Sequence, residues 1–187
     1  MSGYTPNKDP NFWRNDNFKT AEANCGSYAF DVIEWYWPYN HDESYGDDII
    51  ESWNYSGCTF GEALADSTNQ HLQYILDNFS NVRVIHNFNE VAADERIILY
   101  REGIFCGSYA ADLGDECHYR DDEDGCGWEW DFHFIWRDAN GIWHEKMGGG
   151  FIKEIDSPSL NEPWTYWSLA YQGPIIMLAK KETKYAA

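Results

Sequence analysis

An Asn-Gly pair constrains the fold of this chain more than any other feature of its sequence. Asn140 and Gly141 stand between two runs of β-forming residues, 133–137 and 142–147. Asn-Gly between such runs is the strongest short-range signal for a β-hairpin, because both residues tolerate the positive φ angles of a tight turn. We therefore predict two antiparallel strands joined by a turn at 138–141.

Alternation of side chains gives this predicted hairpin a polar face. Successive side chains of a strand point to opposite faces, and opposed residues of paired strands lie close together. His133, near the start of the first strand, and Glu145, near the end of the second, are thus expected to face each other. Such a pair carries chemistry only when a nucleophile joins it, and Cys25 is the best candidate.

Cys25 is expected at the beginning of a helix. The partial positive charge of a helix N-terminus lowers the pKa of a thiol there, so this position favours a reactive cysteine. The alternative interpretation is that Cys25 is a small hydrophobic residue of the core. The helix itself is predicted from apolar residues that recur at helical spacing before Pro38: Ala29, Val32, Ile33, Tyr36 and Trp37.

The composition indicates one folded domain and argues against several classes of function. A chain of 187 residues with 18% aromatic residues is long and apolar enough to bury its own core. Its formal net charge of -19 repels phosphate backbones, so nucleic-acid binding is not expected. No apolar run reaches the length of a membrane span, and the first residues lack the basic and apolar segments of a signal peptide. The expected compartment is the cytoplasm, with no membrane partner.

The five cysteines are expected to be reduced thiols, because their number is odd and no export signal is visible. Cys117 and Cys126 flank a short acidic loop, and whether they pair when oxidised stays open. Together with His118 they lack the Cys-x2-Cys spacing of structural zinc sites. The run 120–131 is similar to a calcium loop, but Arg120 stands at its first ligand position. We expect neither a metal nor a cofactor.

The rest of the chain predicts a single α+β domain over 1–187, beginning with a polar arm at 1–23. A second helix opens at Thr59 with a Thr-x-x-Glu capping box and runs to about Phe79. His71 lies close to the apolar stripe of that helix and is expected to be a packing or surface histidine. Further strands are predicted over 82–86, 96–100 and 174–180, and the Gly-rich, acidic segment 101–130 is predicted to be an inserted flap.

Two segments resemble the signatures of a group of papain-like proteins found in phages and bacteria. The run 24–29, Asn-Cys-Gly-Ser-Tyr-Ala, is similar to the group's nucleophile motif, Asn-Cys-Tyr-x-Tyr-Ala. The run from His133 to Gly148 is similar to its second motif, in which Asp-Tyr-His-Trp-Tyr-Arg is followed by Asp-Gly-x-Trp-Ser-His-Lys-Pro-Gly. The order of the two motifs is that of the NlpC-type cell-wall peptidases. The resemblance implies a papain-like (NlpC-type) fold, with the cysteine helix packed on a small antiparallel sheet.

The resemblance also implies roles for three residues. Cys25 would be the nucleophile, His133 the general base and acid, and Glu145 the residue that orients the imidazole. The group carries a histidine at the position of Glu145. A register shift of one residue would bring His144 there instead, from the opposite face of the strand.

The remaining residues assigned to the site are Asn24, Tyr28 and His144, as binding residues. Tyr28 is a candidate for a polar group that lines the site, and core packing is its alternative. The backbone N–H of Cys25 would donate to the oxyanion, because the first N–H groups of a helix have no partner within it. Gly26 stands where the group has Tyr, which leaves the second oxyanion donor unassigned.

Two functions from different classes are consistent with these features. The first is a cysteine peptidase or amidase that cleaves an amide or isopeptide bond of a peptide or protein substrate, with cell-wall peptides implied by the resemblance. Because no signal peptide is visible, a cell-wall substrate would require delivery by phage lysis or by a dedicated secretion system. The second is a non-catalytic acidic binding or inhibitor protein that mimics the charge of nucleic acid. The oligomeric state stays open.

Overall fold

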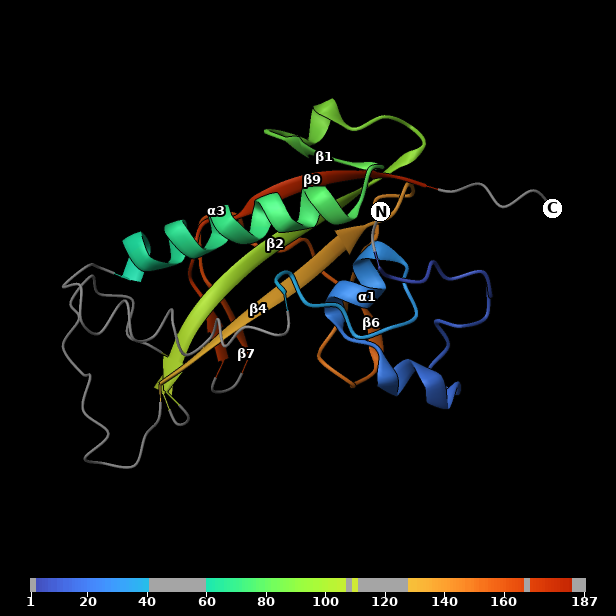
Figure 1. Ribbon diagram of the computed structural model, residues 1–187, viewed down its shortest axis with the longest axis horizontal. Coiled ribbons are helices and arrows are strands. Elements are labelled where there is room, and N and C mark those ends of the chain that lie inside the picture. The colour runs from blue at the N-terminus through green and yellow to red at the C-terminus, as the bar shows by residue number, and fades with distance from the viewer. Residues whose placement is uncertain (1–2, 41–59, 107–108, 111–127, 167–168, 183–187) are drawn as a thin grey trace.

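The computed structural model of the chain describes residues 3–40, 60–106, 109–110, 128–166 and 169–182 (Figure 1). Within these residues, seven strands form one antiparallel sheet in the order β1-β9-β2-β4-β5-β6, with β3 paired to β2, and β7 and β8 form a separate hairpin. The predicted α+β class is confirmed. The strands are β1 (Val82–Ile85), β2 (Glu95–Cys106), β3 (Tyr109–Ala110), β4 (Trp128–Arg137), β5 (Trp143–Lys146), β6 (Ile152–Ile155), β7 (Trp164–Tyr166), β8 (Leu169–Tyr171) and β9 (Ile176–Lys181).

The helices lie on one face of the sheet. Among the described residues they are α1 (Cys25–Phe30) and α3 (Phe60–Asn78), and there are also two short 3₁₀ helices, η1 (Phe18–Glu22) and η2 (Phe88–Glu90). Figure 1 shows α3 running along β2 and α1 lying near the end of β4. The β7–β8 hairpin packs on the opposite face, so the sheet is covered on both sides.

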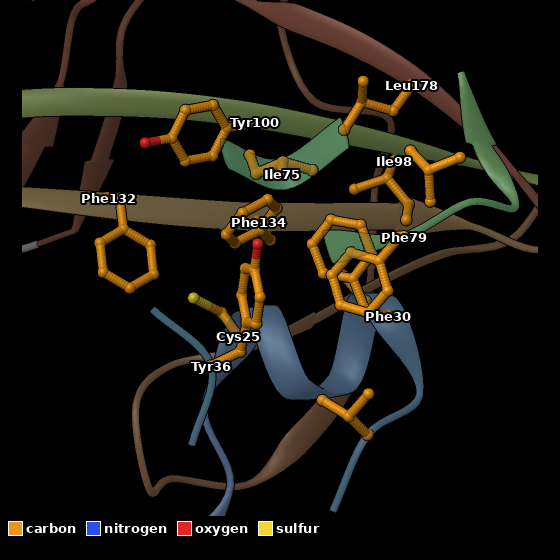
Figure 2. Packing of buried hydrophobic residues seen from close by; sticks show 13 residues of the cluster. Cys25, Phe30, Tyr36, Ile75, Phe79, Ile98, Tyr100, Phe132, Phe134 and Leu178 are labelled. Atoms are coloured by element: carbon orange, nitrogen blue, oxygen red, sulfur yellow. The ribbon is translucent and has the colours of Figure 1, made fainter. Parts of the chain in front are cut away.

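Side-chain alternation in β4 divides the core into two clusters. Phe132 and Phe134 face α1 and α3, where the rings of Phe30 and Phe79 stack with their centroids 4.4 Å apart (Figure 2). Ile135 points the other way, into a second cluster that β7 and β8 complete. A strand segment with both faces buried needs apolar or paired polar side chains, and β4 meets that requirement over 132–135, where the one polar side chain, His133, is paired with Glu145.

The β2–β4 ladder is the longest of the sheet, running from the Ile97–Arg137 pair to the Cys106–Trp128 pair. Strand β2 therefore extends well beyond the predicted strand at 96–100, into the segment predicted to be an inserted flap. The prediction that 101–130 is an inserted flap is therefore wrong for 101–106 and 128–130, because these residues belong to the paired strands β2 and β4. The rest of the flap, with Cys117, His118, Cys126 and the calcium-like run, lies outside the described residues.

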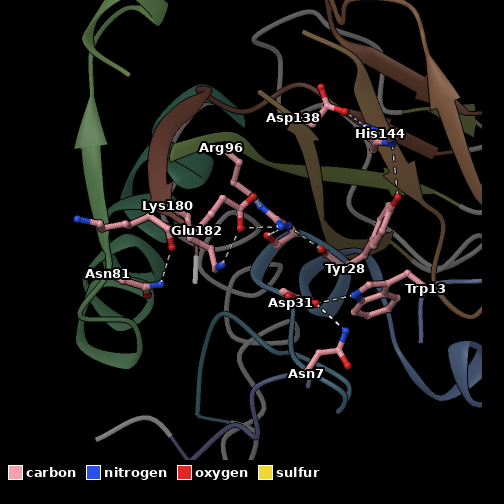
Figure 3. Close-up of polar contacts among 12 residues, drawn as sticks. Asn7, Trp13, Tyr28, Asp31, Asn81, Arg96, Asp138, His144, Lys180 and Glu182 are labelled. Atoms are coloured by element: carbon pink, nitrogen blue, oxygen red, sulfur yellow. Dashed lines mark hydrogen bonds and ion pairs between the residues drawn. The ribbon is translucent and has the colours of Figure 1, made fainter. Parts of the chain in front are cut away.

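Helix α1 is shorter than its apolar spacing predicts. It ends at Asp31, which adopts a left-handed conformation with φ of 59° and is held there by hydrogen bonds from Asn7 (3.0 Å) and the Trp13 indole (2.6 Å) (Figure 3). The chain then continues without helix, yet Val32 and Tyr36 still reach the core. The helical prediction for 31–37 is wrong because apolar spacing reports burial, whereas the N-terminal arm fixes where the helix ends.

The predicted hairpin at 133–147 is confirmed. Its turn is closed by the backbone bond from Asp138 N–H to the Ile142 carbonyl, and Gly141 has a φ of 87°. Strand β5 pairs with β4 only over residues 135–137. In the described part of the chain, the same edge of β4 at residues 131–134 has no strand partner, which leaves room for other groups to approach it.

The other predicted elements agree with the structure more closely. Helix α3 ends at Asn78, β1 covers most of 82–86, and β9 covers most of 174–180; Thr59 of the predicted capping box lies outside the described residues. His71 is buried, with Nδ1 2.7 Å from Glu102 Oε1, and Ser67 donates to the same carboxylate at 2.6 Å. This histidine packs inside the molecule and ties α3 to β2.

Candidate active site

The start of α1 is shaped by the residues on either side of Cys25. The Asn24 side chain caps the helix: its Oδ1 accepts from Ser27 N–H at 3.0 Å, and its Nδ2 donates to the Tyr36 carbonyl at 2.7 Å. A Cβ on Gly26 would stand 2.6 Å from a ring carbon of Tyr36. The sequence Asn-Cys-Gly is therefore required for the close packing of this helix, and the side chain of Asn24 is used for capping.

Cys25 lies at the first position of α1 with only 5% of its surface exposed. Burial raises the pKa of its thiol to about 12, since a thiolate loses its hydration there, and the backbone N–H of Phe134 offsets only part of this effect. The expected lowering of the thiol pKa is thus wrong, because desolvation outweighs the helix terminus. Figure 2 shows Cys25 beside Phe132 and Phe134 of β4.

His133 and Glu145 form a buried pair on the opposite face of the sheet from Phe134. His133 Nε2 lies 3.2 Å from Glu145 Oε2, and both residues are 1% exposed. Glu145 also accepts from the Tyr166 hydroxyl at 2.7 Å and pairs with the Lys153 ammonium at 2.8 Å. Burial opposes ionisation of Glu145, but these three partners outweigh it and lower its pKa to about 2. The carboxylate is therefore ionised, and it engages Nε2, which leaves Nδ1 as the nitrogen free for other chemistry.

The β7–β8 hairpin fixes the ring of His133 from above the sheet. The His133 ring stacks on Tyr171, with centroids 5.3 Å apart and planes at 27°. Gly103 of β2 allows β8 to approach, because a Cβ there would stand 1.9 Å from the Ala170 carbonyl oxygen. Arg101 donates to the Gly173 carbonyl at 2.6 Å and so ties the end of the hairpin to β2.

One cavity of about 1040 Å³ is lined by both Cys25 and His133. It lies at the unpaired edge of β4, beyond the end of β5, where groups from both faces of the sheet can reach a common space. Cys25 and His133, which come from distant parts of the sequence, therefore line the same cavity. Most of the other lining residues are aromatic or belong to the turn after β5: Trp35, Trp37, Phe132, Met147, Gly148, Gly150, Phe151, Tyr166 and Tyr171.

The turn after β5 is held by a buried cation. Lys146 Nζ donates to the carbonyls of Gly148 (2.9 Å) and Gly150 (2.6 Å), both of which line the cavity. Burial lowers the pKa of this ammonium, while the electrostatic influence of Cys25 raises it. Lys146 thus positions one wall of the cavity and brings a positive charge toward the thiol.

Tyr28 and His144 lie on the α1 face of the sheet and do not line this cavity. His144 Nε2 is 3.2 Å from Asp138 Oδ2, and its Nδ1 is 3.5 Å from the Tyr28 hydroxyl (Figure 3). The His144 ring also stacks on Trp136. The register pairs Ile135 with Glu145, so Glu145, and not His144, shares the face of His133.

Several residues of the site were not predicted from the sequence, among them Tyr166, Tyr171 and Asp131. The Tyr171 hydroxyl donates to Asp131 Oδ2 at 2.7 Å, and burial raises the pKa of the Asp131 carboxyl. Asp131 stands two residues before His133, so strand alternation alone could have placed it on the same face. Nothing in the short runs of β7 and β8 predicted that they return over His133.

Within the described ranges, no group of three or more His, Cys, Asp and Glu side chains is arranged to hold a metal ion. The helices described are too short or too polar to cross a membrane. Comparison with known proteins returned no match to the chain, whether to a family model, to a curated protein or to a solved structure.

Proposed function

We propose that the protein is a cysteine hydrolase, a peptidase or amidase, with Cys25 as nucleophile, His133 as base and acid, and Glu145 as the orienting carboxylate. The observation that carries the proposal is that Cys25 and His133 line one cavity while a buried, ionised Glu145 holds the imidazole by its Nε2. A surface histidine or a purely structural thiol needs neither arrangement.

The proposed reaction follows from these positions. His133 Nδ1 removes the proton of the Cys25 thiol as the sulfur attacks the carbonyl carbon of an amide, and the imidazolium then gives that proton to the leaving amine. Water, deprotonated by the same imidazole, hydrolyses the thioester, so an amide and a water become an acid and an amine. Glu145 stabilises the imidazolium in both steps. The backbone N–H of Cys25 is the first oxyanion donor.

The buried state of the thiol makes His133 necessary in this mechanism. A thiol with a pKa of about 12 has almost no thiolate at neutral pH, so it reacts only when a base takes the proton during the attack. The Glu145 carboxylate makes that transfer more favourable, because it stabilises the cation formed on the imidazole.

The sequence resemblance supports a papain-like scaffold of the NlpC type and, with it, cell-wall peptides as the substrate. The described fold agrees with the coarse expectation of a cysteine helix packed on an antiparallel sheet. A cytosolic protein substrate is the alternative within the same enzyme class.

The experiment is hydrolysis of peptidoglycan fragments and of a peptide library by the wild type, Cys25→Ala and His144→Ala, with products identified by mass spectrometry. We expect cleavage products with the wild type and with His144→Ala, and none with Cys25→Ala. His144→Ala is a matched control, because it removes an imidazole on the other face of the sheet. Products that persist in Cys25→Ala would contradict the proposal.

A second function is favoured by the burial of the thiol and the net charge of -19. It is an acidic binding or inhibitor protein that occupies a basic nucleic-acid-binding protein and uses the scaffold without catalysis. This function predicts strong, salt-sensitive binding to such a basic protein, equal in the wild type and in Cys25→Ala, and no products from either substrate set.

A further inference from the structure

Asp131 gives the candidate cavity a negative charge that the described contacts do not neutralise. Asp131 lines the cavity together with Cys25, and its carboxylate accepts hydrogen bonds from two neutral donors, the Tyr171 hydroxyl and the backbone N–H of Phe132. The neighbouring Glu145 differs, since Lys153 pairs with it. Among the described residues, no Lys, Arg or His nitrogen forms an ion pair with Asp131.

Two buried cations of this region already have other partners. Lys146 directs its ammonium to the carbonyls of Gly148 and Gly150, and Arg101, on the same face as Asp131, donates to the carbonyls of Gly173 and Glu162. A half-buried carboxylate without a counter-ion is unfavourable, and a cationic ligand would relieve that cost.

The walls of the cavity suit the same kind of ligand. Aromatic rings from both faces of the sheet line it, including Trp35, Trp37 and Tyr166. The faces of such rings attract ammonium and guanidinium groups, and the attraction is strongest for Trp. A carboxylate in a cavity lined by aromatic rings is therefore complementary to a cation carried on an apolar stem.

We propose that this cavity binds a cationic group of the substrate, an ammonium or a guanidinium, with Asp131 as its counter-ion. The proposal rests on the proposed function for the statement that the ligand is a peptide. It adds that the residue placed near the Cys25 thiol carries a positive charge, either on its side chain or as a free amino terminus.

The test compares how fast charged and neutral thiol reagents reach Cys25. The reagents are 2-aminoethyl methanethiosulfonate, which is cationic, and methyl methanethiosulfonate, which is neutral. Each forms a mixed disulfide with the thiolate and releases methanesulfinate. Mass spectrometry of the Cys25 peptide gives each rate separately from the other four cysteines, and the ratio of the two rates cancels the intrinsic reactivity of the thiol.

We expect the cationic-to-neutral ratio at Cys25 to fall about tenfold in Asp131→Asn, the effect of one charge acting across a partly buried site. Asp156→Asn is the matched control: it removes the same charge from an exposed position outside the cavity and should leave the ratio unchanged. The amide oxygen that Asp131→Asn introduces can still accept the hydrogen bond of Tyr171, and circular dichroism checks that each variant folds. An unchanged ratio in Asp131→Asn, or an equal fall in both variants, would overturn the inference.

The two sources of the cation are distinguished by protection of Cys25 from methyl methanethiosulfonate. Protection by Nα-acetyl-lysinamide assigns the site to a side chain, and protection by alaninamide assigns it to an amino terminus. Nα-acetyl-norleucinamide, which lacks the charge, should not protect; equal protection by it, or protection by none of the three, would overturn the inference. These outcomes are independent of cleavage: a protein that hydrolyses nothing can still show the Asp131-dependent ratio, and an active hydrolase without it refutes this inference alone.

Discussion

Glu145 is the residue on which the geometry of the candidate site depends most. It is buried, yet it accepts hydrogen bonds or ion pairs from an imidazole, a phenol and an ammonium, which come from three different elements. A buried carboxylate is tolerated only when its partners replace the lost water, and here they do so well enough to keep it charged. The polar groups around His133 are thus organised around an anion.

The substitution Glu145→Gln tests whether the buried Glu145 side chain is charged in the folded protein. The folded-state pKa of Glu145, about 2, lies below the ordinary value for a glutamate, so its ionisation stabilises the folded state above the ordinary pKa, and that stabilisation is lost as pH falls toward 2. We expect Glu145→Gln to lower the free energy of unfolding by about 2 kcal/mol at pH 7 and by much less near pH 2.5. Urea denaturation of both proteins at the two pH values measures the difference. If Glu145→Gln lowered the free energy of unfolding equally at the two pH values, Glu145 would not be charged as assigned.

The short β7–β8 hairpin determines, at the scale of elements, where His133 can point. The hairpin approaches β2 at Gly103 and is tied there by Arg101, and it carries the two tyrosines that contact the His133 ring. Gly103→Ala would place a methyl group against the Ala170 carbonyl, so we expect a loss of at least about 2 kcal/mol of unfolding free energy. Gly3→Ala is the control, since a Cβ there contacts nothing within 4 Å. Equal urea midpoints for the two variants would refute this role of Gly103.

The elements also differ in how far the sequence predicts them. The central hairpin is predictable because Asn140-Gly141 is a local signal, and the same alternation places Glu145 beside His133 and His144 on the other face. The end of α1 is not predictable from local sequence, because it depends on contacts from Asn7 and Trp13 of the N-terminal arm. The return of β7 and β8 over the sheet is a long-range packing event between runs of three residues, which carry no periodicity. The raised pKa of Cys25 likewise depends on burial, which the helix-start position alone does not reveal.

Repulsion among its many carboxylates acts on the molecule as a whole. The net charge of -19 opposes the compact state. Some of the basic side chains that offset it form exposed ion pairs, such as Arg14–Asp16, which contribute little to stability. We therefore expect added NaCl to raise stability: the melting temperature should increase by several degrees between about 0.02 and 0.5 M salt, as the Debye length shortens. A melting temperature that falls with salt would show that specific ion pairs outweigh the general repulsion.

The central claim is that His133 activates the Cys25 thiol, and the rate of Cys25 alkylation by iodoacetamide as a function of pH tests it most directly. Mass spectrometry of the Cys25 peptide gives the rate in the wild type, in His133→Ala and, as a control, in His144→Ala. We expect the wild type and His144→Ala to react at neutral pH, His133→Ala to react at least about tenfold more slowly there, and the rate of His133→Ala to rise only toward the thiol pKa of about 12. Coincident pH–rate curves for the wild type and His133→Ala would contradict the claim.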